Sequence, residues 1–152
     1  GYIAFGQQSG ALYAKGDLQS VPRFPFGGSF TDLDDFIMKV NTLPLPTTSV
    51  DFYSDKKTRQ DSATVKAGAK PWLVLELEDV NLLKKINCFA SSQGAITAEV
   101  IDNKLWAQAS QPLSPGRTRY NCTAHTGEKG RFFWYTQQWL VTDEKGEWTY
   151  RD

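Results

Sequence analysis

The chain has 152 residues, of which 40% are hydrophobic and 22% charged, so it is long enough and apolar enough to bury a core. Its 17 basic residues balance 17 acidic ones, which predicts no electrostatic surface for nucleic acid. No window approaches about 18 consecutive apolar residues, so no membrane span is expected.

The sequence contains two cysteines, Cys88 and Cys122, and one histidine, His125. A structural zinc site takes about four cysteine or histidine ligands, so no metal site is expected within this chain. The cysteines leave two alternatives, a single disulfide or two buried thiols. The choice between them depends on the redox compartment.

The first 30 residues predict one short strand followed by a long loop. Tyr-Ile-Ala-Phe at 2–5 is an apolar run between two glycines, which is typical of a buried strand in a mixed or parallel sheet. Residues 11–30 contain several glycines and prolines, which favour a loop with at most a brief extended segment.

A helix is expected to begin at Thr31. Thr31 and Asp34 have the spacing of a capping box, and apolar residues follow at intervals of three, four and seven at Leu33, Phe36, Ile37 and Val40. The helix must end before Pro44, because proline supplies no backbone donor and disfavours the helical state of the residue before it.

The remainder divides into a linker and an all-β part. Residues 47–70 are rich in Thr, Ser, Asp and Lys with almost no apolar periodicity, so they are expected to form a linker. From residue 71 onward the pattern predicts strands at about 72–78, 84–90, 95–101, 104–109, 117–123 and 131–141. Leu73, Leu75 and Leu77 alternate with other residues, so one sheet face is buried. The simplest closure is a sandwich of two small antiparallel sheets.

Five segments have a recognisable pattern: GYIAFGQQSGA at 1–11, PRFPF at 22–26, KVNTLPLP at 39–46, RYNCTA at 119–124 and FWYTQQW at 133–139. They resemble bacterial polysaccharide deacetylases of the NodB-homology class. The first three are similar to the end of the catalytic domain, and the last two to the appended domain of one subgroup. The expected fold class is therefore α+β. Residues 1–46 would be the strand-loop-helix tail of an α/β barrel and 71–152 a mainly antiparallel β-sandwich.

The resemblance implies an enzyme that removes acetyl groups from N-acetylated sugar polymers with a divalent metal, usually zinc. In that family an aspartate and two histidines bind the metal, and these motifs lie before the matched segments. With His125 alone, this chain cannot supply them. The expected partners are therefore the catalytic barrel and the polysaccharide, and the segment itself would act as scaffold. The family is exported, which favours a Cys88–Cys122 disulfide and a periplasmic, secreted or cell-surface location.

Two groups near the start of the chain are candidate substrate contacts. Gln7, Gln8 and Ser9 follow the predicted strand, and loops at the carboxyl ends of barrel strands commonly line active sites. The alternative is a polar turn that satisfies its own backbone. Arg23 could orient a carboxylate through two hydrogen bonds, or it could form a structural salt bridge.

The tryptophans after residue 71 raise a rival hypothesis, a carbohydrate-binding module. The predicted strand 131–141 has large apolar residues on both faces, which favours core on one face and a docking interface on the other. Trp106 and Trp148 have charged or polar neighbours and are the better candidates for stacking on sugar. A structural or dimerisation domain is the third alternative.

Overall fold

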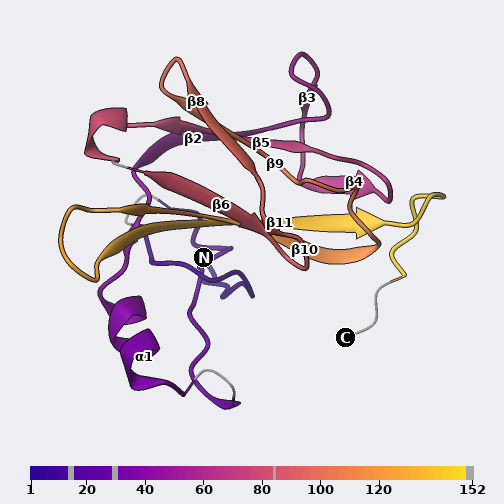
Figure 1. Cartoon of the computed structure of the whole chain (residues 1–152). Helices are drawn as coiled ribbons and strands as arrows, with labels where there is room; N and C mark the ends of the chain where they lie inside the picture. Colours follow the sequence, from indigo (N-terminus) through magenta and orange to yellow (C-terminus); the bar gives the residue numbers. More distant parts are fainter. Residues whose placement is uncertain (14–15, 29–30, 84, 150–152) are drawn as a thin grey trace.

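Alternating side chains from residue 43 onward produce two β-sheets that lie one upon the other. The computed structural model describes residues 1–13, 16–28, 31–83 and 85–149. Figure 1 shows the two layers, with the helix and the first residues of the chain on one side of them. All pairings between neighbouring strands are antiparallel except the two that flank one side of the last strand.

The first sheet has the order β1-β11-β10-β6-β7, and β4 also pairs with β11. Its strands are β1 (Leu43–Pro44), β4 (Thr64–Lys66), β6 (Ile86–Ala90), β7 (Gly94–Ala95), β10 (Gly116–His125) and β11 (Phe132–Thr142). The second sheet has the order β3-β2-β5-β9-β8. Its strands are β2 (Thr47–Tyr53), β3 (Arg59–Gln60), β5 (Trp72–Leu77), β8 (Thr97–Ile101) and β9 (Lys104–Gln108). A short 3-10 helix, η2 (Val80–Leu82), follows β5.

The core lies between the two sheets and is built by period-two alternation. Leu73, Leu75 and Leu77 of β5 are at most 1% exposed, as their spacing predicts. They belong to one buried cluster with residues of the facing sheet. The two-sheet prediction for the second half of the chain is therefore confirmed.

The long strand β11 has an incomplete second edge. It pairs with β10 from Phe132 to Val141. On the other edge, β1 pairs in parallel only at Phe133 and Trp134, and β4 only from Leu140 onward. Between these two short strands, no described strand pairs with this edge of β11. This unpaired stretch of β11 forms one wall of a cleft.

Residues 47–70 differ from the expected linker, because they supply β2, β3 and β4. Phe52 of β2 points into the core and Tyr53 stands opposite Trp72 of β5. β3 and β4 have two and three residues and lie beside one neighbour each. β3 and β4 are too short to show a period, and in β2 polar residues such as Thr47, Ser49 and Asp51 dominate the composition, so composition alone conceals all three.

The predicted helix is present as α1 (Leu33–Val40) and ends before Pro44 as expected. Its cap is one residue later than predicted. The Asp32 carboxylate accepts from the Asp35 backbone N–H at 2.8 Å, whereas the Thr31 hydroxyl donates to the Gly28 carbonyl at 3.2 Å. Aspartate is as good an N-cap as threonine, so the neighbouring residue takes the role.

The expected burial of residues 2–5 is wrong within this chain. Tyr2 is 92% exposed, Ile3 64% and Phe5 68%. The segment forms a single parallel bridge, Phe5 with Val21, in which the Val21 N–H donates to the Ala4 carbonyl and the Gly6 N–H donates to the Val21 carbonyl. Burial of a strand depends on neighbours on both faces, and the described part of the chain provides none here.

The disulfide joins two neighbouring strands of the first sheet. Cys88 of β6 stands directly opposite Cys122 of β10, with 4.1 Å between their Cα atoms. The two side chains are 2% and 0% exposed, so the bond lies in the core. The predicted Cys88–Cys122 bridge is confirmed.

Removing the disulfide should destabilise the fold strongly. The two residues are 34 positions apart, for which the chain-entropy relation gives about 3–4 kcal/mol. We expect the Cys88→Ala/Cys122→Ala variant to lose about that much free energy of unfolding in urea titrations. A loss below about 1 kcal/mol would show that the native bridge adds little beyond ordinary packing.

Tyr120 connects the core to the backbone of the second sheet. Its hydroxyl donates to the Pro71 carbonyl and accepts from the Ala109 N–H, both at 3.2 Å. Burial raises the pKa of the Tyr120 phenol from its usual 10.0 to about 12. The unfolded chain therefore releases this proton before the folded chain does, so the folded state loses stability as pH rises between these two values.

A Tyr120→Phe variant separates these two roles. At about pH 8 it should cost about 1–2 kcal/mol, because the buried Ala109 N–H loses its acceptor. Between about pH 10 and pH 12, its free energy of unfolding should fall less steeply than that of the wild type. Urea titrations at several pH values measure both effects. Equal slopes in the two proteins would contradict the raised pKa.

Candidate functional site

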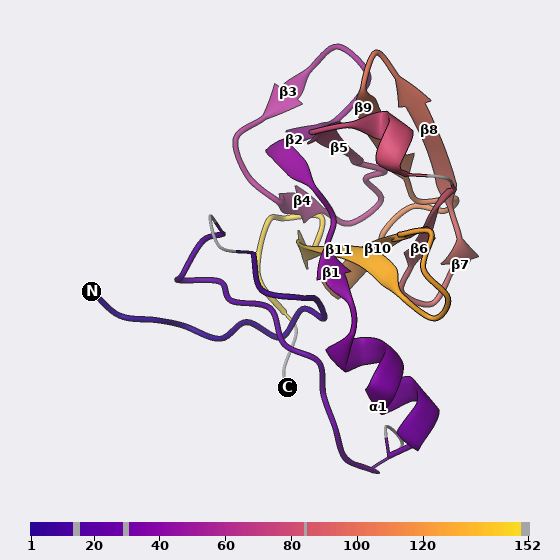
Figure 2. The ribbon, with the colours of Figure 1, turned by 90° about the vertical axis from the view of Figure 1, so that its left-hand side faces the viewer.

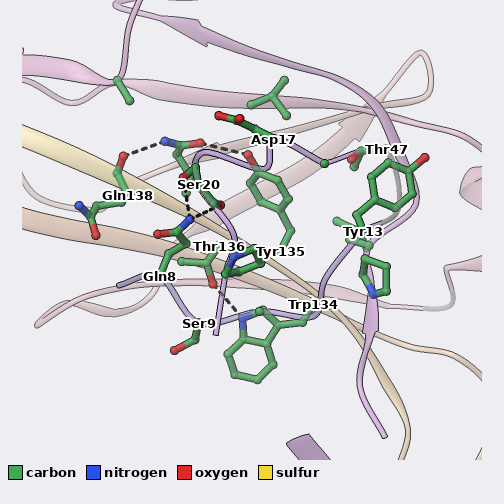
Figure 3. Close-up of a pocket in the computed structure, with 18 of the residues that line it drawn as sticks. Gln8, Ser9, Tyr13, Asp17, Ser20, Thr47, Trp134, Tyr135, Thr136 and Gln138 are labelled. Atoms are coloured by element: carbon green, nitrogen blue, oxygen red, sulfur yellow. Dashed lines mark hydrogen bonds between the residues drawn. The ribbon is translucent and has the colours of Figure 1, made fainter. Parts of the chain in front are cut away.

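A cleft of about 700 Å³ lies where the first residues of the chain cross the edge of the two sheets. Its walls come from residues 8–13 and 16–22, from β2 and from the unpaired stretch of β11. Figure 3 shows the side chains that line it. The cleft is therefore a consequence of the gap between β1 and β4.

Trp134 anchors the first segment of the chain to β11. The Phe24 ring meets the Trp134 ring edge to face, with 5.3 Å between centroids. A Cβ on Gly10 would lie 3.2 Å from the Pro22 Cβ and 3.9 Å from Trp134 Cδ1, so only a residue without a side chain fits this approach easily. The indole Nε1 donates to Thr136 at 2.8 Å, which fixes the ring orientation.

Gln8 holds the loop beside Trp134 in shape. Its Nε2 donates to the Ser20 carbonyl at 2.8 Å and to the Ser20 hydroxyl at 2.9 Å, as Figure 3 shows. Its own carbonyl accepts from the Arg23 N–H at 3.0 Å. The Gln8 side chain is thus largely committed to the loop, which agrees with the alternative interpretation as a polar turn.

The β11 wall of the cleft presents a chain of neutral hydrogen-bonding groups. The Tyr135 hydroxyl donates to Gln137 Oε1 at 3.0 Å, and Gln137 Nε2 donates to the Gln138 carbonyl at 2.7 Å. The Oε1 atom of Gln138 is buried and has no hydrogen-bond partner among the described residues. These groups are amides, a carbonyl and a phenol, all neutral at pH 7, and burial raises the pKa of the Tyr135 phenol still further above its usual value.

Tyr13 crosses from the first segment to the second sheet. Its hydroxyl donates to the Glu78 carboxylate at 3.1 Å. This hydrogen bond to Glu78 raises the pKa of the Tyr13 phenol. Among the lining residues that the structure describes, Asp17 is the one with a formal charge, and the others are neutral.

The structure separates the candidate residues that the sequence suggested. Gln8 and Ser9 line the cleft, whereas Gln7 and Arg23 are exposed outside its lining. Trp106 lies on the outer face of the second sheet, and Trp148, which is 46% exposed, follows β11 near the end of the described residues. These six residues therefore do not form one site.

A second group of side chains gathers around Trp106. Its ring lies 5.4 Å from that of Tyr53 and 6.0 Å from that of Trp72, measured between centroids. Sequence reasoning missed Tyr53 because the residue fell in the expected linker. The signal was present: in TTSVDFY at 47–53, Phe52 and Tyr53 are consecutive and must face opposite sides of any strand.

Within the residues that the structure describes, no three His, Cys, Asp or Glu side chains converge on a point where a metal ion could bind. His125 is exposed at the end of β10, and its ring packs against Phe132 with 4.5 Å between centroids. Over the same residues, no helix has the length and apolar character needed to cross a bilayer. Compared with known protein families and with curated protein sequences, the chain matches none.

Truncating Trp134 should release the first segment of the chain. We expect Trp134→Ala to expose residues 1–24 to protease while the two sheets remain folded, because the Phe24 contact and the Thr136 hydrogen bond are lost together. The loss in stability should be about 2–4 kcal/mol. Trp148→Ala removes an indole that does not contact the first segment through Phe24, so this control should leave the digestion of that segment unchanged. Identical digestion of the two variants would show that Trp134 is not the anchor.

Proposed function

We propose that this chain is the C-terminal portion of an exported, metal-dependent polysaccharide deacetylase, which hydrolyses the N-acetyl groups of N-acetylhexosamine polymers. In this proposal residues 1–46 complete the catalytic barrel and the two sheets act as its scaffold. The observation that carries the docking role is an apolar surface on the first 40 residues that nothing in the described chain covers.

The uncovered apolar side chains are concentrated at the start of the chain. Of the sixteen large hydrophobic residues that are exposed in the described structure, ten lie within the first 40 positions: Tyr2, Ile3, Phe5, Leu12, Leu18, Phe26, Leu33, Phe36, Ile37 and Val40. Singly exposed hydrophobic residues are ordinary, but ten within 40 positions are an unusual concentration. This concentration favours docking to a second folded body.

Helix α1 has the geometry of such a docking element. Leu33, Ile37 and Val40 are spaced along one face and are 66%, 48% and 62% exposed. Asp35 and Lys39, four positions apart, form an ion pair at 2.5 Å. No residue of the helix is buried. Burying one large aliphatic side chain contributes about 1.5–3 kcal/mol, so this face would add to the stability of a docked partner domain.

The enzymatic part of the proposal is supported by the sequence resemblance, which places similar segments both in the first 46 residues and in the sheets. The residues of this chain do not fit the implied metal, because His125 is the sole histidine and is exposed. The metal would belong to the barrel. Gln8 and Ser9, in the cleft wall beside the docking surface, would then form part of the substrate rim.

Export is supported by the disulfide. Cys88 and Cys122 are bonded in the core, and such bonds persist in oxidising compartments but rarely in the cytosol. Periplasm, cell surface and external medium all meet this requirement.

A charge on the helix face should uncouple the proposed domains. In the intact parent enzyme loaded with zinc, we expect Ile37→Asp to lower kcat/KM for acetate release from N-acetylglucosamine oligomers by at least about tenfold, because docking would bury an unpaired carboxylate. Ile101→Asp makes the same change at a residue of similar exposure, 44% against 48%, on β8. This control should keep wild-type activity.

Three further outcomes decide the proposal. Equal activities of the Ile37→Asp and Ile101→Asp enzymes would exclude the docking role. The isolated 152-residue chain should neither bind zinc tightly nor release acetate, since it offers one histidine. Acetate release by that chain, abolished by a chelator, would overturn the assignment of the metal to the barrel. An intact parent that releases no acetate would overturn the enzyme class.

A further inference from the structure

The outer face of the second sheet carries three aromatic rings in contact. On β5, Leu73 and Leu75 point into the core, so Trp72 points outward, and on β9 the buried Leu105 and Ala107 leave Trp106 outward in the same way. Tyr53 of β2 stands opposite Trp72 in the register. We call Tyr53, Trp72 and Trp106 the aromatic face. All three side chains are half-buried and reach solvent.

The aromatic face sits on a well-covered layer. Val74 lies between Asp51 and Trp106 in the register and points to the same outer side, yet it is only 2% exposed. Large side chains therefore cover the sheet here. Such a layer holds the rings in fixed positions, and fixed rings bind a ligand with a smaller loss of conformational entropy.

Two ion pairs border the rings. The Lys56 ammonium lies 4.8 Å above the centroid of Trp72 and pairs with Glu99. On β3 and β2, Arg59 Nη2 contacts Asp51 Oδ1 at 2.6 Å. Exposed pairs of this kind add little stability, so their main consequence is to place hydrogen-bond donors and acceptors around the rings.

The geometry points to a carbohydrate site: we propose that the aromatic face binds a neutral polysaccharide chain of pyranose sugars. Equatorially substituted pyranose rings present C–H faces that pack on aromatic rings, and their hydroxyls both donate and accept hydrogen bonds. Tyr53, Trp72 and Trp106 supply the apolar surface. Carboxylates of the bordering pairs accept from hydroxyls, and the ammonium and guanidinium groups donate to them.

Charge selects the neutral ligand. Lys56 and Arg59 are matched by Glu99 and Asp51, so the border has no net charge. A nucleic acid or an acidic glycan would meet two carboxylates, and a cationic polymer would meet two cations. An apolar protein surface would have to desolvate both ion pairs on docking, which is costly. Neutral hydroxyl-rich chains incur neither penalty.

The aromatic face lies away from the docking surface. In Figures 1 and 2 the second sheet forms the layer far from α1, and the first sheet stands between them. The inference is thus independent of the proposed deacetylase activity. A polysaccharide could occupy this face while the first 46 residues are docked elsewhere.

Titration calorimetry of the 152-residue chain with soluble oligosaccharides tests the inference. We expect neutral oligomers of N-acetylglucosamine or glucose to bind with a Kd below about 1 mM. Trp106→Ala should weaken binding at least about tenfold, and Tyr53→Ala should weaken it as well. Trp148→Ala, which removes an exposed indole outside the aromatic face, should leave the Kd unchanged.

The salt concentration and the charge of the oligosaccharide provide a second test of the neutral ligand. Binding of a neutral chain should be nearly constant between about 0.05 and 0.5 M NaCl, whereas a charged ligand would be screened. Fully deacetylated glucosamine oligomers and uronic acid oligomers should bind more weakly than neutral ones. Tighter binding of either charged polymer would overturn the assignment of a neutral ligand.

The carbohydrate site can still be tested if the Trp106→Ala variant fails to fold. If Trp106→Ala unfolds the chain, Glu99→Gln on the exposed border should still weaken binding about threefold, because the amide accepts a weaker hydrogen bond than the carboxylate. Absence of wild-type binding at the highest soluble ligand concentration would refute the site. Equal losses in the Trp106→Ala and Trp148→Ala variants would also refute it.

Discussion

The packing of Trp139 between the two sheets is the contact on which the rest of the structure depends. Its indole is fully buried and lies 5.2 Å from the Phe52 ring of the facing sheet and 5.3 Å from Tyr120 on the neighbouring strand, between centroids. Its Nε1 has no acceptor among the described residues, so the contact is apolar in character. Because β11 is fixed here, Trp134 at its other end can hold the first segment over the cleft.

Sequence reasoning recovered strands that have one apolar face in the core, and it missed strands in which the sequence shows no such apolar period. β5, β9, β10 and β11 were predicted within one or two residues because one face enters the core and shows period-two alternation. β3 and β4 escaped because two or three residues beside a single neighbour carry no period. The disulfide followed from the resemblance to an exported family, since spacing alone left Cys88 and Cys122 open to either state.

The candidate site was predictable only in part, since its residues come from segments far apart in the chain. Gln8 and Ser9 were recognised, and both line the cleft. The sequence predicted an interface on one face of β11 without assigning Trp134 to it, and in the structure Trp134 packs against Phe24. The aromatic face could not be assembled from the sequence, because register decides that Tyr53 meets Trp72, and register requires the folded sheet.

The apolar surface of the first 40 residues and the aromatic face differ in chemistry. The first suits a permanent contact and the second a reversible one. The first 40 residues expose aliphatic side chains such as Leu33 and Val40, each worth about 1.5–3 kcal/mol when buried, so leaving them in water is costly. Such a surface is stable only if it stays covered. The aromatic face instead covers its rings with one another and with the Lys56–Glu99 pair, whose worth is about 0.2–1 kcal/mol. Because this ion pair is weak, a ligand can displace it at little cost in free energy, which suits a site that binds and releases its ligand repeatedly.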